Sequence, residues 1–247
     1  MNKSKCSSYL LGMFSLLILW YLFSLILKLP IIPSPIDVIV HIIRIFYSKI
    51  LIHVSVSIWR IVSGVAISIA IGAPIGLCMG YFKSMDKVLS PIVYLTYPIP
   101  KIALLPIVML LFGLGDLSKT VMIVLIVIFQ IIVAVRDGVK DIPTETYYPL
   151  FSLGAGYLDL FREIIIPASL SKLFTSLRIA MATAISVLFF TETFGTEYGM
   201  GFFIMDAWIR INYVEMYSGI VVLSIMGLSL FLVIDFVERL LCPWMYE

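Results

Sequence analysis

The chain has 247 residues, of which 62% are hydrophobic and only 13% are charged. Soluble globular domains contain about 25% charged residues, so this composition excludes an ordinary soluble domain and indicates a polytopic membrane protein. The formal net charge is only +2 and the basic residues are scattered, which argues against nucleic acid as a partner.

The first predicted membrane span covers residues 9–27 and follows Lys3 and Lys5. About 20 apolar residues in a helix cross a hydrocarbon core of about 30 Å. The run lacks a small-residue cleavage site and is longer than a signal-peptide core, so we expect an uncleaved span. An amphipathic stretch at residues 36–47 then predicts an interfacial helix on the outer side.

The second predicted span, residues 58–81, has a small residue at every fourth position. This spacing places the small residues on one face of a helix, where a second helix backbone can approach closely. A pathway lined by backbone is the alternative, and we favour helix packing. The face consists of Gly64, Ser68, Gly72, Gly76 and Gly80.

The third predicted span, residues 94–113, contains Pro98, Pro100 and Pro106. Prolines at membrane depth free backbone carbonyls, which neighbouring groups or a water-lined cavity must satisfy. These prolines therefore mark a broken span and a candidate gate or pathway wall. We expect Lys101, which lies among them, to extend toward the inner surface rather than face a solute.

Three further spans are expected at residues 120–135, 173–190 and 217–237. Residues 113–120 resemble a phosphate loop, but Ser118 replaces the glycine before Lys119, so no nucleotide site is predicted there. Residues 191–216 form an acidic, glycine-broken segment, in which Glu192 is a further candidate pathway residue.

Histidines and cysteines give no sign of a metal site. His41 and His53 have no matching cysteines or paired carboxylates. The three cysteines lie far apart along the chain, so we predict neither a metal site nor a disulfide framework.

Six spans place both termini on the same side of the membrane. With Arg60, Lys101 and Arg178 set aside as edge cases, the inner segments hold nine basic residues and the outer segments five. The positive-inside rule therefore predicts cytoplasmic termini and a cytoplasmic segment between the spans at 120–135 and 173–190. The inner residues are Lys3, Lys5, Lys83, Lys87, Arg136, Lys140, Arg162, Lys172 and Arg239, and the outer ones Lys28, Arg44, Lys49, Lys119 and Arg210.

That cytoplasmic segment belongs to residues 141–178, the least hydrophobic long stretch between two apolar ones. A helix-start signal at residues 142–144, a glycine break at 154–156 and a second break at Pro167 predict two short helices with a hinge. The first helix has more apolar side chains than it can bury in its own thin layer. We expect it to insert into a groove on a partner, with a helix lying on lipid headgroups as the alternative.

The same segment resembles the cytoplasmic loop of ABC-importer permeases, whose pattern reads E-A-A, three residues, Gly, nine residues, Ile, one residue, Leu-Pro. Gly154 and the run from Ile164 to Pro167 meet the spacing, and Ala155 also fits. The positions of E-A-A are occupied by residues 148–150, which read Tyr-Pro-Leu, and the nearest acid is Glu145 one turn upstream. The loop residues that this resemblance implies for coupling to an ATPase are Glu145, Tyr148, Leu150, Gly154, Ala155, Ile164 and Pro167.

Further motifs look like the permeases of nitrate, sulfonate and taurine ABC importers. They lie at residues 29–35, 59–64, 98–106, 112–115 and 199–201. The resemblance implies a homodimer, a dimer of ATP-binding subunits docked on the loop, and an extracytoplasmic binding protein that delivers a small organic anion. Close relatives also carry pyrimidine precursors of thiamine.

An enzyme and an ion-coupled secondary transporter are the two other functional classes that this sequence could represent. No constellation of nucleophile, base and orienting group is visible, so we expect no catalytic residues and no cofactor on this chain, with ATP bound by the partner subunit. An ion-coupled secondary transporter would need acids at membrane depth. Only Glu192 and Asp235 qualify, and both lie close to predicted span ends.

The sequence therefore predicts an all-α polytopic membrane protein with about six membrane helices and a two-helix coupling loop, which implies the type I ABC-importer permease fold. We expect residues 1–55 to form the first span and the interfacial segment, and residues 56–240 a core of five spans with the coupling loop at 141–170. Residues 241–247 would form a short cytoplasmic tail. The expected location is the cell membrane, in contact with lipid.

Overall fold

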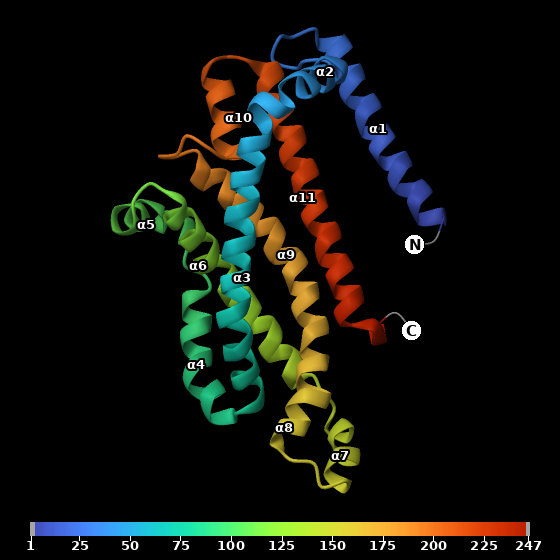
Figure 1. Ribbon diagram of the computed structural model, residues 1–247, viewed down its shortest axis with the longest axis vertical. Coiled ribbons are helices and arrows are strands. Elements are labelled where there is room, and N and C mark those ends of the chain that lie inside the picture. Colours follow the sequence, from blue (N-terminus) through green and yellow to red (C-terminus); the bar gives the residue numbers. More distant parts are fainter. Residues whose placement is uncertain (1–2, 246–247) are drawn as a thin grey trace.

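The structure is a computed structural model that describes residues 3–245, with side chains described from residue 11 onward except for Met13. Every regular element in this part of the chain is helical, which confirms the all-α class. Long helices run roughly along the long axis of the molecule, and two short ones, α7 and α8, project at its lower end (Figure 1).

Eleven α-helices are described, joined in places by short π or 3-10 turns. Their bounds are α1 (Lys3–Leu27), α2 (Pro35–Ile45), α3 (Leu51–Tyr81), α4 (Lys83–Thr96), α5 (Leu105–Phe112), α6 (Asp116–Lys140), α7 (Tyr148–Ser152), α8 (Tyr157–Leu160), α9 (Ile166–Glu192), α10 (Met200–Ile209) and α11 (Tyr213–Leu241).

Four continuous helices among the described residues are long and apolar enough to cross a membrane, and a bent pair adds a fifth candidate. The first predicted span coincides with the backbone helix α1. Part of that span lies outside the residues with described side chains, and Phe14–Leu27 alone forms a shorter apolar helix. The four long helices are Pro35–Tyr81, Asp116–Lys140, Tyr157–Glu192 and Tyr213–Leu241.

The predicted interfacial helix is not separate from the second span. A π-helical turn at Phe46–Ile50 joins α2 to α3, which gives 47 residues of continuous helix. This length exceeds the requirement of a bilayer core, about 20 residues. The second predicted span, residues 58–81, therefore lies wholly within a longer helix, which also includes His53 and Ser57.

The third predicted span was placed wrongly, although its break was anticipated. Helix α4 begins at Lys83, and the pair Lys83–Thr96 and Lys101–Phe112 is bent by 79°. The bend falls around Pro98 and Pro100, which cannot donate backbone hydrogen bonds. Pro106 does not contribute a break, because it occupies the first turn of α5, where a missing N–H costs nothing.

The small-residue face of α3 lies against α6. A Cβ atom placed at Gly64 would lie 2.7 Å from Ile123 Cγ2, and one at Gly76 would lie 2.7 Å from the carbonyl oxygen of Ile132. At Gly80 it would lie 2.5 Å from the Val139 Cβ. Such distances leave no room for a side chain, so the two backbones meet at the glycines. Gly72 faces α6 in the same way, and the Ser68 hydroxyl donates to the Gly64 carbonyl.

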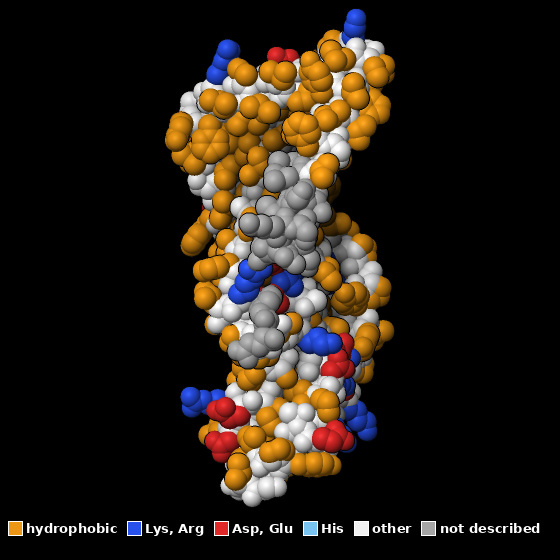
Figure 2. Space-filling model, turned by 90° about the vertical axis from the view of Figure 1, so that its right-hand side faces the viewer, with side chains coloured by type: hydrophobic (Ala, Val, Ile, Leu, Met, Phe, Trp, Pro, Cys, Tyr) orange, Lys and Arg blue, Asp and Glu red, His pale blue; other side chains and the backbone are white. Residues whose placement is uncertain are grey.

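The main core lies where α3, α6, α9, α10 and α11 meet, and apolar side chains cover much of the outer surface (Figure 2). In Figure 2 most charged side chains lie in the lower half of the visible face. A broad apolar exterior is expected of helices that contact lipid. Core side chains include Ile61, Val65, Ile123, Val127, Ile131, Leu177, Met181, Leu188, Met200 and Met226.

Candidate functional site

The segment between α6 and α9 lies at the lower end of the molecule, beyond the ends of the long helices (Figure 1). After α6 ends at Lys140, a 3-10 turn at Thr144–Tyr147 leads into α7, and α8 follows after a four-residue turn. The two short predicted helices and the hinge between them are therefore present.

Gly154 forms the hinge. Its φ is +72°, in the left-handed region that glycine adopts readily. The chain closes around it because the Ala155 amide donates to the Leu150 carbonyl at 3.0 Å and the Gly154 amide donates to the Phe151 carbonyl at 3.1 Å. Nothing lies within 4 Å of a Cβ placed at Gly154. The requirement for glycine is therefore conformational rather than steric.

The departure from the E-A-A pattern is compatible with this geometry. Helix α7 begins at Tyr148, so Pro149 lies in its first turn, where no intrahelical N–H bond is needed. Glu145 lies in the preceding 3-10 turn and is exposed. Pro149 therefore starts the short helix instead of distorting it.

Five large apolar or aromatic side chains of α7, the hinge and α8 face solvent. Their exposed fractions are 57% for Tyr148, 57% for Phe151, 84% for Leu153, 76% for Tyr157 and 85% for Leu158. We call these five residues the coupling surface. A cluster of this kind on a projecting tip is typical of a protein–protein contact.

Helix α8 continues into α9 without a break, so the predicted interruption at Pro167 is wrong. A π-helical turn at Phe161–Ile165 joins them, and the Ile166 amide donates to the carbonyl of Phe161. Pro167 is the second residue of α9 and directly follows this π turn, which accommodates it within the continuous helix. Ile164 is buried in this junction. Because the helix is continuous, a displacement of α8 passes directly into a membrane span.

The base of the segment is attached to neighbouring helices. The ring of Tyr81, at the end of α3, lies 4.8 Å from the ring of Phe161. The Lys172 ammonium of α9 donates to the Asp141 carboxylate at 2.9 Å. Burial raises the pKa of Tyr147, and the nearby Tyr81 adds to the effect, so the Tyr147 phenol remains a neutral hydrogen-bond donor.

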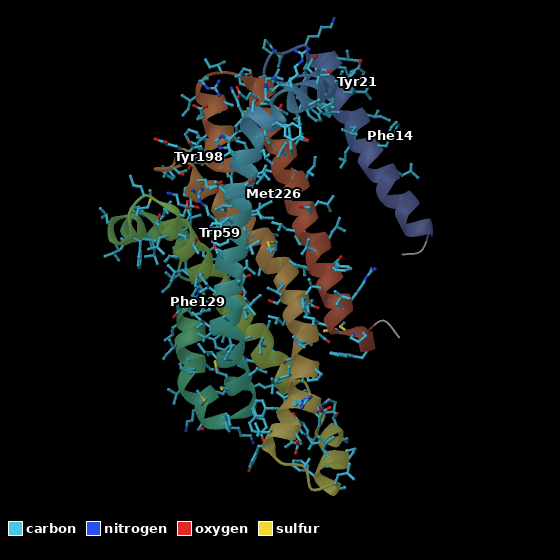
Figure 3. The ribbon with its side chains drawn as sticks, in the orientation of Figure 1. Phe14, Tyr21, Trp59, Phe129, Tyr198 and Met226 are labelled. Carbon is cyan, nitrogen blue, oxygen red and sulfur yellow. The ribbon has the colours of Figure 1, made fainter. Side chains whose placement is uncertain are left out.

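A second polar cluster lies far from the coupling surface, in the part of the molecule marked by Trp59 and Tyr198 (Figure 3). At its centre the buried Arg60 of α3 donates to Glu192 Oε1 at 2.7 Å and, through Nε, to Asp116 Oδ1 at 2.9 Å. It also donates to the carbonyl oxygen of Tyr198 at 2.8 Å. One guanidinium thus joins the ends of α6 and α9 to the loop before α10.

Glu192 is fully buried and its carboxylate is well supplied with donors. Besides Arg60, it accepts from the Ser57 hydroxyl at 2.9 Å and from the Gly201 amide at 2.9 Å. Gly199 passes so close that a Cβ atom there would lie 2.3 Å from Glu192 Cδ. The carboxylate thus holds helix ends together in this structure, and its part in a pathway or gate stays a prediction.

The sequence of residues 64–246 matches the family described as the inner membrane component of binding-protein-dependent transport systems. The chain belongs to this family. It is thus a multi-pass ABC-importer permease rather than an enzyme, and in this family ATP hydrolysis belongs to separate subunits. Permeases of this family work with an ATPase and a binding protein.

Individual relatives resemble the permease over most of its length. The formylaminopyrimidine transport permease protein ThiX of Halalkalibacterium halodurans is 29% identical over 93% of this chain and 92% of its own. The taurine transport system permease protein TauC of Escherichia coli K12 is 29% identical over 78% of this chain and 70% of its own.

A solved structure supports the fold of the permease. A chain of the MetNI methionine ABC transporter, in an inward-facing conformation, has a TM-score of 0.65 and 19% identity. The match covers 76% of this chain and 94% of that one. The similarity confirms the type I permease fold.

The bend of the permease between α4 and α5 holds Lys101 in an unexpected position. Its ammonium donates to the carbonyl oxygens of Thr96 at 3.1 Å and Tyr97 at 3.3 Å, and lies 4.8 Å from the centre of the Phe129 ring. The Thr96 carbonyl cannot accept a helical bond from residue 100, because Pro100 has no N–H, and it accepts from the Ile99 amide at 3.3 Å instead. The Lys101 ammonium therefore supplies hydrogen-bond donors to the carbonyls at the bend.

Sequence reasoning did not find the partners of Arg60. Trp59 and Arg60 belong to the motif at residues 59–64, but this motif does not reveal what the arginine contacts. An arginine inside a membrane helix requires a partner, and this general rule was the available signal. Asp235, the second acid considered for ion coupling, is likewise paired, since it accepts from Arg178 Nε at 2.7 Å.

Among the residues that the structure describes, no group of three or more His, Cys, Asp or Glu side chains could hold an ion. His53 instead binds the backbone of the loop before α10, because its Nδ1 accepts a hydrogen bond from the Gly199 amide at 3.1 Å.

Proposed function

We propose that two copies of the permease form the translocation pathway of an ATP-driven importer for a small organic anion, such as a sulfonate, taurine or nitrate. An extracytoplasmic binding protein delivers the solute, and a dimer of ATP-binding subunits docks on the coupling surfaces. Both termini lie in the cytoplasm, and this chain itself binds no nucleotide.

One observation carries the coupling part of this proposal. The coupling surface is strongly exposed and is attached through the π turn at Phe161–Ile165 to the long helix α9. A partner that binds these side chains can therefore move the membrane span formed by α9. This arrangement favours energy from a protein partner over energy from an ion gradient, because Glu192 and Asp235 are both held by arginines.

The choice of an anion is supported by the taurine permease among the relatives. A second solute, a formylaminopyrimidine precursor of thiamine, is supported by the greater extent of the other match. ThiX aligns with 93% of this chain, against 78% for TauC.

Uptake by the reconstituted importer separates the two solutes. The permease is placed in vesicles with its ATPase and binding protein, and ATP-dependent accumulation of taurine, an alkanesulfonate, nitrate and formylaminopyrimidine is measured. We expect accumulation of one of the anions. Accumulation of the pyrimidine alone would assign the second solute, and uptake driven by an ion gradient without the ATPase would contradict both.

A further inference from the structure

A cavity with both apolar and charged lining residues lies at the lower end of the molecule, where the α3–α4 turn meets the end of α6. Its volume is about 660 Å³, a size typical of small-molecule sites. It lies beside the base of the segment between α6 and α9, which we call the coupling segment, because Tyr147 of that segment forms part of its wall. The lining residues are Met79, Gly80, Tyr81, Lys83, Asp86, Lys87, Val139, Lys140 and Tyr147.

The cavity carries an excess of positive charge. Three lysines line it, against the single carboxylate of Asp86. That carboxylate is already used, since it pairs with Lys140 and accepts from the Ser90 hydroxyl at 2.7 Å. Lys83 and Lys87 are exposed, and neither forms an ion pair with any described acidic residue. Two ammonium groups at the cavity thus remain without a counter-charge.

Backbone N–H groups add to the lysine ammonium groups as donors for an anion. Helix α4 starts at Lys83 and has no side-chain cap, so the N–H groups of its first turn lack partners within the helix. The positive end of the helix dipole also points toward an anion placed there. The neutral phenol of Tyr147, which also lines the cavity, offers one more donor. Cations, amide donors and a hydroxyl together suit a phosphate group.

Exposed apolar side chains on the same turn indicate that the phosphate belongs to a lipid rather than to a free phosphate ion. Phe82, Met85 and Val88 are exposed and alternate with Lys83 and Lys87 along the start of α4. A free phosphate ion would gain nothing from them, whereas acyl chains would cover them. Basic pockets at the cytoplasmic ends of membrane helices recognise lipid headgroups through this combination.

We propose that this cavity binds the phosphate group of an anionic phospholipid from the membrane leaflet on the side of the coupling surface. The bound headgroup joins three elements, because Lys83 and Lys87 belong to α4, Lys140 to α6 and Tyr147 to the coupling segment. It therefore fixes the base of the coupling segment, and membranes poor in anionic lipid loosen it.

Lipid binding to the purified full-length permease tests the proposal without any transport assay. Native mass spectrometry compares retention of phosphatidylglycerol with that of phosphatidylcholine with the same acyl chains. We expect selective retention of phosphatidylglycerol, which the double variant Lys83→Gln/Lys87→Gln weakens about 25-fold, at about fivefold for each lysine. The variant Lys83→Arg/Lys87→Arg retains binding and shows that the fold is intact.

The matched control is Lys28→Gln/Arg162→Gln, which removes two exposed positive charges outside the cavity. Equal weakening by both double variants would show diffuse surface attraction and overturn the site. Displacement of the lipid by millimolar inorganic phosphate, with no effect of Phe82→Ser/Val88→Ser, would assign a free-anion site instead. Loss of ATPase association without loss of lipid would assign the lysines to a protein partner, which also contradicts the proposal.

Discussion

At the scale of single residues, the Arg60 cluster shows what local sequence reasoning can and cannot find. Its acidic partners, Asp116 and Glu192, lie 56 and 132 positions away in the chain. A charged residue in an apolar helix implies that a polar or charged partner exists. Which residue is that partner depends on how α3, α6 and α9 pack together. Gly154 is different, because its φ follows from the adjacent turn and could be predicted.

Glu192→Ala is expected to destabilise the permease strongly, because the buried Arg60 guanidinium loses its buried counter-charge and keeps only the exposed Asp116. Removal of one member of a buried pair costs about 3–5 kcal/mol. Thermal unfolding of the purified protein, followed by tryptophan fluorescence, measures the loss. The double variant Arg60→Met/Glu192→Met recovers part of the stability, and exposed Glu163→Ala serves as the control. An unchanged melting temperature for Glu192→Ala would show that the cluster does not stabilise the helix ends.

At the scale of elements, the hydrophobic runs predict that the long helices exist, but they do not predict the residues at which the helices begin and end. The prolines located the bend near Pro98 and Pro100, yet α4 begins among the charges at Lys83, where hydropathy argued against a helix. Pro167 was predicted to break a helix that continues. A π turn depends on backbone packing at Phe161–Ile165, which no single residue type signals, and it lets the proline lie inside a continuous helix.

Gly154→Val is expected to uncouple the ATPase and leave membrane insertion unchanged. A β-branched residue at φ +72° costs about 1 kcal/mol or more in local conformational energy, so the angle between α7 and α8 changes. The measurements are ATP-dependent uptake and co-purification of the ATPase. Gly156→Ala is the control, since its φ of −83° suits any residue and a Cβ there meets only Asp159 Oδ2 at 3.7 Å. Full uptake with Gly154→Val would reduce the segment to a simple connector.

At the scale of the whole molecule, the orientation in the membrane can be tested by labelling. The count of basic residues predicts that Lys140 faces the cytoplasm and Lys28 the outside. In a variant without native cysteines, Lys140→Cys is expected to react with an impermeant maleimide only in inside-out vesicles. Lys28→Cys is expected to react only in intact cells. The opposite pattern would invert the topology and place the coupling surface out of reach of a cytosolic ATPase.

The central claim is that the five exposed side chains of the coupling surface bind the ATPase and transmit its motion through α9. The most direct measurement is the dissociation constant of the purified permease for its ATPase, compared between wild type and Leu153→Asp/Leu158→Asp. Both leucines are exposed on the projecting tip, so the variant is expected to fold normally, with an unchanged melting temperature, and to bind the ATPase at least tenfold more weakly. Unchanged affinity in a normally folded variant would show that the ATPase docks elsewhere.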